Sequence, residues 1–119
     1  MRIRRINKGG GRYREVVVPS RQRKQACRKA LPRLEAIAIT LDPRGVQHGF
    51  TPGRSPVTNA LVHRGYRWTL TMDLADCFGH VRREHVPIED VVDAWWVDDV
   101  AVQGLPTSPI VANIAAADM

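Results

Sequence analysis

The sequence lacks several features that define large protein classes. It has no apolar run near the roughly 18 residues of a membrane-spanning helix, so we expect no membrane association. Its basic N-terminus lacks the apolar stretch of a secretory signal, and we expect a cytoplasmic protein. Its two cysteines, Cys27 and Cys77, have no metal-ligand spacing and are expected to be reduced, partly buried thiols. The four histidines also lack such spacing, and a surface or satisfied polar role is expected for each: His48, His63, His80 and His85.

The chain also has little negative charge in its first half. Residues 1–67 hold 16 of the 18 Lys and Arg residues but only 3 of the 12 Asp and Glu residues. A basic segment of this kind suits a polyanion, which it would bind through phosphate contacts and counterion release. The acidic remainder suits a divalent metal, or is merely a second face of the same domain. A basic surface that is only solvated is the alternative for the first half.

The N-terminal pattern predicts a β-hairpin followed by a helix. Residues 2–6 and 14–18 are expected to be strands, joined by residues 7–13 with three consecutive glycines. Ser20 is expected to cap a helix that begins at Arg21. Pro32 falls inside the helical pattern and predicts a kink or break near Leu31. The apolar residues at helical spacing are Cys27, Ala30, Leu31 and Leu34.

The middle of the chain predicts a loop, a short helix and a strand. Residues 42–56 carry three prolines and three glycines and are expected to form a loop. A short helix is expected over residues 56–63, after Ser55. The alternation of residue types from Arg67 to Leu74 is typical of a strand.

Two more helices are expected towards the C-terminus. Residues 88–96 are predicted to be helical, with one core tryptophan and one partly exposed at Trp95 and Trp96. Residues 108–117 are predicted to form a helix with Pro109 at its first position. The order of elements indicates an α+β fold in one small domain or a piece of a larger one.

Asp73 is the first candidate for chemistry. A strand that ends at Asp73 would deliver this carboxylate to the edge of a sheet, where a divalent ion can reach it. Asp76 is close in sequence, but it stands where a turn begins, so a helix N-cap is an equally good interpretation. Two-metal phosphoryl transfer needs at least two carboxylates, and Asp73 alone is only part of such a site.

Four blocks of this sequence, in order, resemble those of prokaryotic reverse transcriptases of the retron and group II intron type. Residues 67–78, RWTLTMDLADCF, resemble motif A, and residues 103–114, QGLPTSPIVANI, resemble motif B. His48 to Ser55, with Asn59, Ala60 and His63, resembles the block that precedes motif A in these enzymes. Residues 8–14 and Pro19 resemble the fingers hairpin.

The resemblance implies the fingers and partial palm of a right-hand polymerase. Residues 1–66 would be a basic, fingers-like region, and residues 67–119 a partial palm with motifs A and B. The intact enzyme would be an RNA-directed DNA polymerase, in which a primer 3′-hydroxyl attacks a deoxynucleoside triphosphate. Its expected cofactor is Mg²⁺, and its expected partners are an RNA template and a DNA primer.

The same resemblance assigns roles to individual residues. Asp73 would be the catalytic, metal-binding aspartate, with Leu74 beside it at the metal and the nucleotide. Phe78 would lie under the incoming sugar and exclude a 2′-hydroxyl, although a core phenylalanine is the alternative. Gln103 and Gly104 would lie beside the nucleotide, where glycine permits close approach.

The basic and polar assignments follow in the same way. Arg14 and Lys8 would neutralise the triphosphate from the fingers. Arg12 and Arg21 would contact nucleic acid. Arg54 and Asn59 would either contact the template strand or brace the palm. The resemblance does not choose between these two roles.

One departure from the pattern bears on activity. The family's motif C, an aromatic-x-Asp-Asp hairpin, follows motif B, but the sequence stops at Met119 before such a motif and before a thumb. Residues 96–99, WVDD, have the right letters but precede Gln103, and we interpret them as unrelated to catalysis. We therefore expect a fragment that is inactive alone, or one that acts with a separate chain carrying motif C and thumb. A catalytically incomplete nucleic-acid-binding module and a decayed reading frame are the alternatives.

Overall fold

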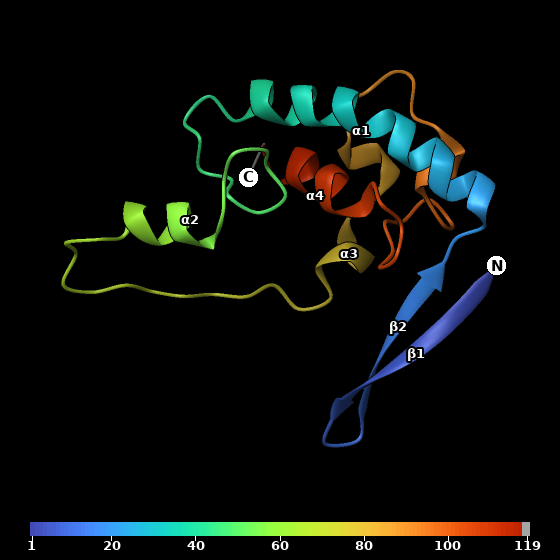
Figure 1. The fold of residues 1–119 in the computed structure, drawn as a ribbon, viewed down its shortest axis with the longest axis horizontal. Coiled ribbons are helices and arrows are strands. Elements are labelled where there is room, and N and C mark those ends of the chain that lie inside the picture. Colours follow the sequence, from blue (N-terminus) through green and yellow to red (C-terminus); the bar gives the residue numbers. More distant parts are fainter. Residues whose placement is uncertain (118–119) are drawn as a thin grey trace.

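The computed structural model describes residues 1–117 and contains a projecting hairpin and a body of helices (Figure 1). The strands of the hairpin are β1 (Arg2–Gly9) and β2 (Arg12–Val18), which form a two-stranded antiparallel sheet. The helices are α1 (Arg21–Leu41), α2 (Pro56–Val62), α3 (Cys77–His80) and α4 (Ser108–Ala116), with 3-10 turns at Arg83–His85 and Asp93–Trp95. This mixture of helices and strands is consistent with an α+β fold. No helix within residues 1–117 is both long and apolar enough to cross a membrane.

The predicted hairpin is confirmed, and its strands run further towards the tip than expected. Arg2 lies opposite Val18 and Arg5 lies opposite Glu15, and the Arg5 Nε donates to Glu15 Oε1 over 2.9 Å. Gly10 and Gly11 have φ of 60° and 73°, values that suit glycine in a tight connection. Val17 is the buried residue of the hairpin, so the ribbon is attached to the body at one end only.

The predicted helix from Arg21 is confirmed, and of the two outcomes expected near Leu31, a kink or a break, the break does not occur. The Ser20 hydroxyl accepts a hydrogen bond from the Arg23 backbone N–H, as predicted for a cap. The helix continues through Pro32 to Leu41, and in Figure 1 its axis changes direction near the middle. A proline inside a helix costs about 3 kcal/mol. Burial of Leu34 and Ala38 on the far side of Pro32 offsets this cost.

The core lies between α1 and α4, so both halves of the chain build it. The interhelical packing is confirmed by burial of Cys27 and Leu34 on α1 and of Ile114 on α4. Cys77 is exposed rather than partly buried, and both cysteines are free thiols. The remaining buried core residues are Ala38, Val81, Val86, Trp95, Trp96, Ala101, Ile110 and Val111.

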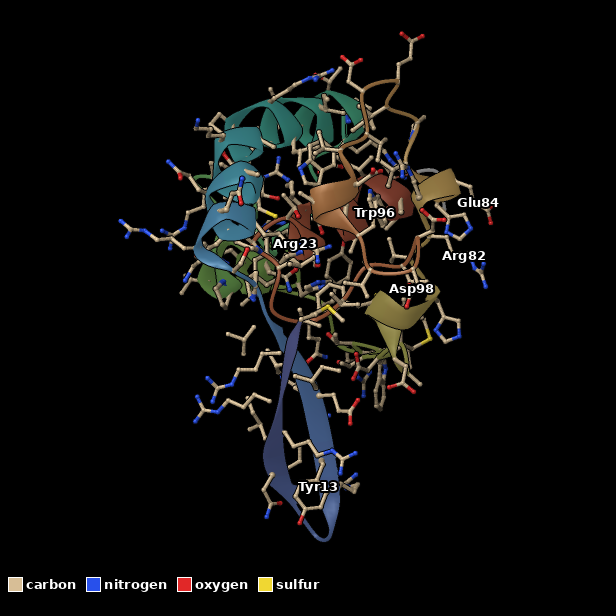
Figure 2. The ribbon with its side chains drawn as sticks, turned by 90° about the vertical axis from the view of Figure 1, so that its right-hand side faces the viewer. Tyr13, Arg23, Arg82, Glu84, Trp96 and Asp98 are labelled. Atoms are coloured by element: carbon tan, nitrogen blue, oxygen red, sulfur yellow. The ribbon has the colours of Figure 1, made fainter. Side chains whose placement is uncertain are left out.

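The predicted helix over residues 88–96 is wrong. This stretch is irregular apart from the 3-10 turn Asp93–Trp95, and both tryptophans are buried, with Trp95 2% and Trp96 4% exposed. Trp95 ends the 3-10 turn and Trp96 leaves it with an extended backbone, and both indoles are part of the core between α1 and α4. The Arg23 guanidinium donates to the carbonyls of Ala94 and Trp96 and so holds this irregular stretch against α1; Figure 2 shows Arg23 beside Trp96.

The predicted strand over residues 67–74 is also wrong. The backbone there forms neither helix nor strand, and every residue of the stretch is exposed. A strand is stable only when a neighbour satisfies its backbone hydrogen bonds. Within residues 1–117, β1 and β2 pair only with each other, and no strand is placed beside this stretch.

The predicted loop and the predicted helices after Ser55 and from Ser108 are confirmed, each helix ending one residue earlier than expected. Residues 42–55 form a loop, and α2 begins after Ser55, whose side chain and Thr58 form a reciprocal capping box. The last helix begins at Ser108 with Pro109 in its first turn.

Candidate functional site

The hairpin and the body enclose a cleft of about 510 Å³. The side chains around it come from segments far apart in sequence. The cleft runs along the hairpin, with Lys8 and Arg14 near its tip and Val17 at its base; Phe78 comes from α3 and Gln103 from the loop before α4. These four residues were predicted to bind nucleotide from three separate sequence blocks, and the fold brings them to one cleft. Gly104 adjoins it in sequence.

The Gln103–Gly104 turn is where the hairpin is attached. The Val17 backbone N–H donates to the Gln103 carbonyl over 2.7 Å, and this hydrogen bond joins β2 to the loop before α4. Gly104 has φ of +110°, and a Cβ there would lie 1.9 Å from the Val17 carbonyl oxygen. Glycine was expected here because a ligand approaches closely; the close approach that the structure contains is that of β2.

Lys8 and Arg14, which line the cleft, are exposed and form no ion pair with another residue of the described part of the chain, 1–117. Arg5, on the same hairpin, is instead paired with Glu15. Exposed, unpaired cations keep their full charge available to an anion, so Lys8 and Arg14 give the hairpin side of the cleft a positive potential.

Phe78 occupies an intermediate position. It is half-buried, packs against the core and also lines the cleft. Both interpretations that the sequence allowed, a core residue and a residue facing a ligand, therefore have a structural basis.

Three aspartates bear on the cleft, in addition to Glu15 of the hairpin, and the structure separates them. Asp73 is exposed on the irregular stretch, and neither Asp73 nor Leu74 lines the cleft. Asp76 lines it from the N-cap position of α3, with φ of 49° and no side-chain capping bond. Asp98 lines it as well, from a tight turn between Val97 and Val100 (Figure 2).

Asp98 is the cleft residue that sequence reasoning dismissed. Asp98 and Asp99 have φ of 51° and 60°, and Val97 and Val100 exchange two backbone hydrogen bonds of 3.0 Å across them. Aspartate tolerates this left-handed backbone, so a pair of aspartates between valines is a signal for a tight hairpin turn. The sequence contains this turn signal, but Asp98 and Asp99 were interpreted as unrelated to catalysis because they precede motif B instead of following it.

Mg²⁺ needs oxygen ligands that converge. No group of three Asp, Glu, His or Cys side chains within residues 1–117 is placed to hold a metal ion. The described residues, in this arrangement, therefore do not fit a two-metal centre by themselves.

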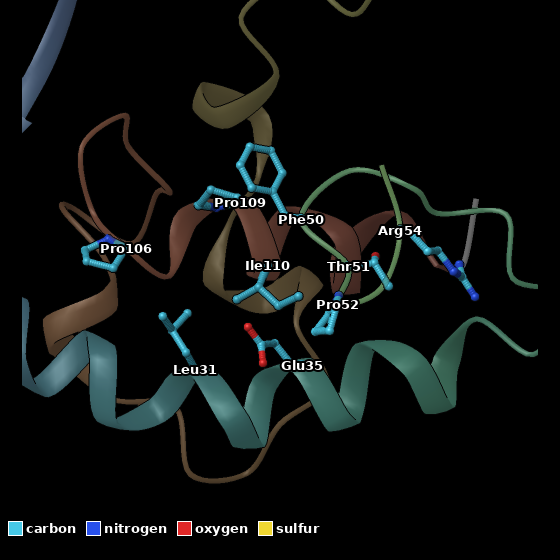
Figure 3. Close-up of a pocket in the computed structure, with 9 residues that line it drawn as sticks. All are labelled: Leu31, Glu35, Phe50, Thr51, Pro52, Arg54, Pro106, Pro109 and Ile110. Carbon is cyan, nitrogen blue, oxygen red and sulfur yellow. The ribbon is translucent and has the colours of Figure 1, made fainter. Parts of the chain in front are cut away.

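The block that precedes motif A lies in a different place. Phe50, Thr51, Pro52 and Arg54 line a second cavity, of about 360 Å³, against α1 and the start of α4 (Figure 3). Glu35 of α1 and Ile110 of α4 are on the opposite wall.

Arg54 has a bracing role in this structure. Its Nη1 donates to Asp42 Oδ2 over 3.0 Å and to the Gln47 carbonyl over 2.6 Å. Hydrogen bonds from the backbone N–H groups of Gln47 and Val46, together with Arg54, hold the pKa of Asp42 below its ordinary value of 3.8, against the opposing effect of burial. The loop is thus closed around one carboxylate at the end of α1.

The other predicted nucleic-acid contacts are exposed and apart from the cleft. Arg12 lies at the start of β2, Arg21 at the start of α1, and Asn59 on α2. Arg23, which no sequence argument selected, is the cation that instead binds the core loop at Ala94 and Trp96.

Comparison with known proteins gives one partial relationship. The chain is 37% identical over 76 residues to the Retron Mx162 reverse transcriptase of Myxococcus xanthus, a match that covers 64% of this chain and 15% of that protein. No protein-family profile and no solved structure matches the chain. The finding supports a reverse transcriptase-like relationship over part of the sequence, and the chain spans only a small share of its relative's length.

Proposed function

We propose that this chain is the fingers and part of the palm of an RNA-directed DNA polymerase, and that the cleft beside the hairpin receives a deoxynucleoside triphosphate. The observation that carries the proposal is the convergence of Lys8, Arg14, Phe78 and Gln103 on that cleft. The partial relationship to a retron reverse transcriptase supports the choice of reaction.

In this proposal the chain's residues bind and orient the nucleotide. Lys8 and Arg14 neutralise the triphosphate, and charge neutralisation with positioning supplies most of the catalysis of phosphoryl transfer. Phe78 sets the space beside the sugar. Asp73 and Leu74 contribute to holding Mg²⁺, which would supply charge stabilisation, but only together with ligands that the described arrangement does not bring to Asp73.

Titration of the purified chain with a fluorescent deoxynucleoside triphosphate tests the proposal. Arg14→Gln is expected to weaken binding about tenfold, since a hydrogen bond to a charged group contributes about 1.5–3 kcal/mol. Arg4→Gln is the matched control, because Arg4 is an exposed arginine of the same hairpin that does not line the cleft. Equal losses in the two variants would mean that only general charge is being measured.

Sugar selection gives a second, independent readout. Phe78→Val should raise the affinity for a ribonucleoside triphosphate relative to the deoxy form, because the smaller side chain leaves room for a 2′-hydroxyl. An unchanged ratio in a variant that circular dichroism shows to be folded would assign Phe78 to packing alone.

A nucleic-acid-binding module without catalysis is the second candidate. It is favoured by the exposed cations of the hairpin, including Arg2, Arg4 and Arg12, none of which lines the cleft. Binding of RNA without any binding of nucleoside triphosphates would favour this candidate.

A further inference from the structure

The stretch from Tyr66 to Leu74 exposes a row of large apolar side chains. Figure 1 shows it as an isolated extended trace between α2 and α3. Its exposed apolar residues occupy alternate positions: Tyr66 is 73% exposed, Trp68 83%, Leu70 80%, Met72 82% and Leu74 66%. In an extended strand, alternate residues share one face, so pairing would gather all five on one side. An exposed, strand-like stretch of this kind invites pairing with another chain.

The order of residues in this stretch is symmetric about Leu70. Threonines flank Leu70 on both sides, and Trp68 and Met72 come next. Arg67 and Asp73, of opposite charge, follow at equal distances from Leu70. Tyr66 and Leu74 complete the pattern. An antiparallel pair of two such strands, centred on Leu70, would place each residue opposite its counterpart in this symmetry.

We propose that two copies of this chain associate by antiparallel pairing of residues 66–74 about Leu70. In this register Arg67 of each copy lies opposite the partner's Asp73, which makes two cross-strand ion pairs. Apolar residues lie opposite apolar residues, and threonine lies opposite threonine. The backbone groups that residues 66–74 leave unpaired gain the neighbour that a strand requires.

Charge selects this register over its neighbours. A shift of the centre to Thr69 places Leu74 opposite the partner's Arg64. It also removes both ion pairs, because Arg67 then lies opposite the partner's Thr71 and Asp73 opposite the partner's Gly65. A centre between two residues would place apolar side chains opposite polar ones, which costs apolar burial. The Leu70-centred register alone satisfies both the apolar and the charge pattern.

The same register supplies an occupant for an apolar groove on the body. The groove, of about 630 Å³, is lined by Leu74 together with Val81, Ala112 and Ala115. Because Leu74 lies opposite the partner's Tyr66 in this register, that ring is brought next to a residue of the groove. Burial of an aromatic side chain there would stabilise the pair beyond its backbone hydrogen bonds.

The association goes beyond the proposed function and uses Asp73 differently. A carboxylate paired with an arginine of a second copy is not free to bind a metal ion, so the paired dimer and a chain whose Asp73 binds metal would be two alternative states of the protein. Nucleotide binding at Lys8, Arg14 and Phe78 does not involve residues 66–74, and failure of either proposal leaves the other standing.

Sedimentation velocity of the purified chain over a range of concentrations, about 1–200 µM, tests the pairing, and dimer is expected to form as the concentration rises. Arg67→Asp should raise the dimer dissociation constant roughly tenfold, because it replaces two ion pairs with two contacts between carboxylates. Asp73→Arg should do the same through opposed arginines. The double variant, Arg67→Asp with Asp73→Arg, restores both ion pairs and should restore the dimer.

A second pair of variants separates this surface from exposed apolar residues in general. Leu70→Lys places two ammonium groups opposite each other at the symmetry axis and should abolish the dimer. Leu61→Lys, on exposed α2, is the matched control and should leave it intact. Near-ultraviolet circular dichroism of the buried indoles of Trp95 and Trp96 reports whether each variant is folded.

A chain that remains monomeric throughout overturns the proposal and leaves residues 66–74 to a strand of another protein or of a longer polypeptide. A dimer that the double variant does not restore, or one that Leu70→Lys leaves intact, overturns it as well, because each result assigns the association to another register or surface.

Discussion

The hairpin and the stretch 66–74 have the same kind of sequence and different structures. Both contain β-branched and aromatic residues, which favour strands, and both are almost wholly exposed. In the hairpin, glycines at the tip return the chain on itself, so each strand meets its partner within a few residues. The stretch 66–74 has no such neighbour within the part of the chain that the structure describes. A local sequence pattern therefore permits a strand, and the strand forms only where a neighbouring strand satisfies its backbone hydrogen bonds.

The largest expected effect on stability is at Gly104, where the hairpin is attached to the body. Gly104→Ala is expected to destabilise the fold by about 3 kcal/mol, through strain in the left-handed backbone and overpacking against Val17. Chemical denaturation measures this free energy of unfolding. Gly53→Ala is the control for strain alone, since Gly53 has φ of +75° but no atom within 4 Å of its added Cβ. Equal losses at the two positions would contradict the importance of the contact with β2.

Hydrogen exchange compares the hairpin with residues 66–74 directly. At low protein concentration the paired amides of β1 and β2 should exchange on the order of tenfold to a hundredfold more slowly than those of residues 66–74, because only the former are hydrogen-bonded. Raising the concentration should slow exchange in 66–74 and not in α2. Protection of 66–74 that is independent of concentration would indicate an intramolecular partner.

The two regions should also differ in their contribution to RNA binding. One face of the hairpin carries three arginines: Arg2, Arg4 and Arg14. Arg14 shares their face because it lies opposite Ile6, which follows Arg2 and Arg4 at alternate positions of β1. Replacing all three with Gln should reduce the slope of log affinity against log salt by about 2, the expectation for three lost phosphate contacts on a single strand. Arg67→Gln should reduce it by less than about 0.7. Affinity that does not change between about 50 and 200 mM salt would exclude phosphate contacts as the basis of binding.

The smallest expected effect is on pH dependence, at the loop that leads towards the exposed stretch. The pKa of Asp42 is lower in the folded chain than its ordinary value of 3.8, so its contribution to stability is present above that value and is lost as pH falls through the lower, folded pKa. Asp42→Asn should therefore reduce stability at pH 7 and make little difference at strongly acidic pH. Urea unfolding of the original chain and of Asp42→Asn at both pH values measures this difference in stability. An equal loss of stability at pH 7 and at acidic pH would attribute the effect to packing.

The helices were predictable to the extent that their signals are local. Ser20 and Ser55 cap helices, and Pro109 opens one, because capping depends on a few adjacent backbone groups. The candidate cleft was predictable only as a set of residues: resemblance named Lys8, Arg14, Phe78 and Gln103, but nothing in the sequence placed Asp98 beside them. The burial of both Trp95 and Trp96 could not be predicted either, since it depends on Arg23 holding their loop from another element.

By itself, the sequence determined the hairpin, the first residues of α1, α2 and α4, and the concentration of positive charge in the first half of the chain. These follow from turn residues, caps and composition, which act over a few residues. Only the tertiary structure decided that α1 passes through Pro32, that residues 88–96 are irregular, and that residues 67–74 lack a partner. Each of these depends on whether distant groups supply burial or hydrogen bonds, and a local pattern carries no information about which distant groups are present.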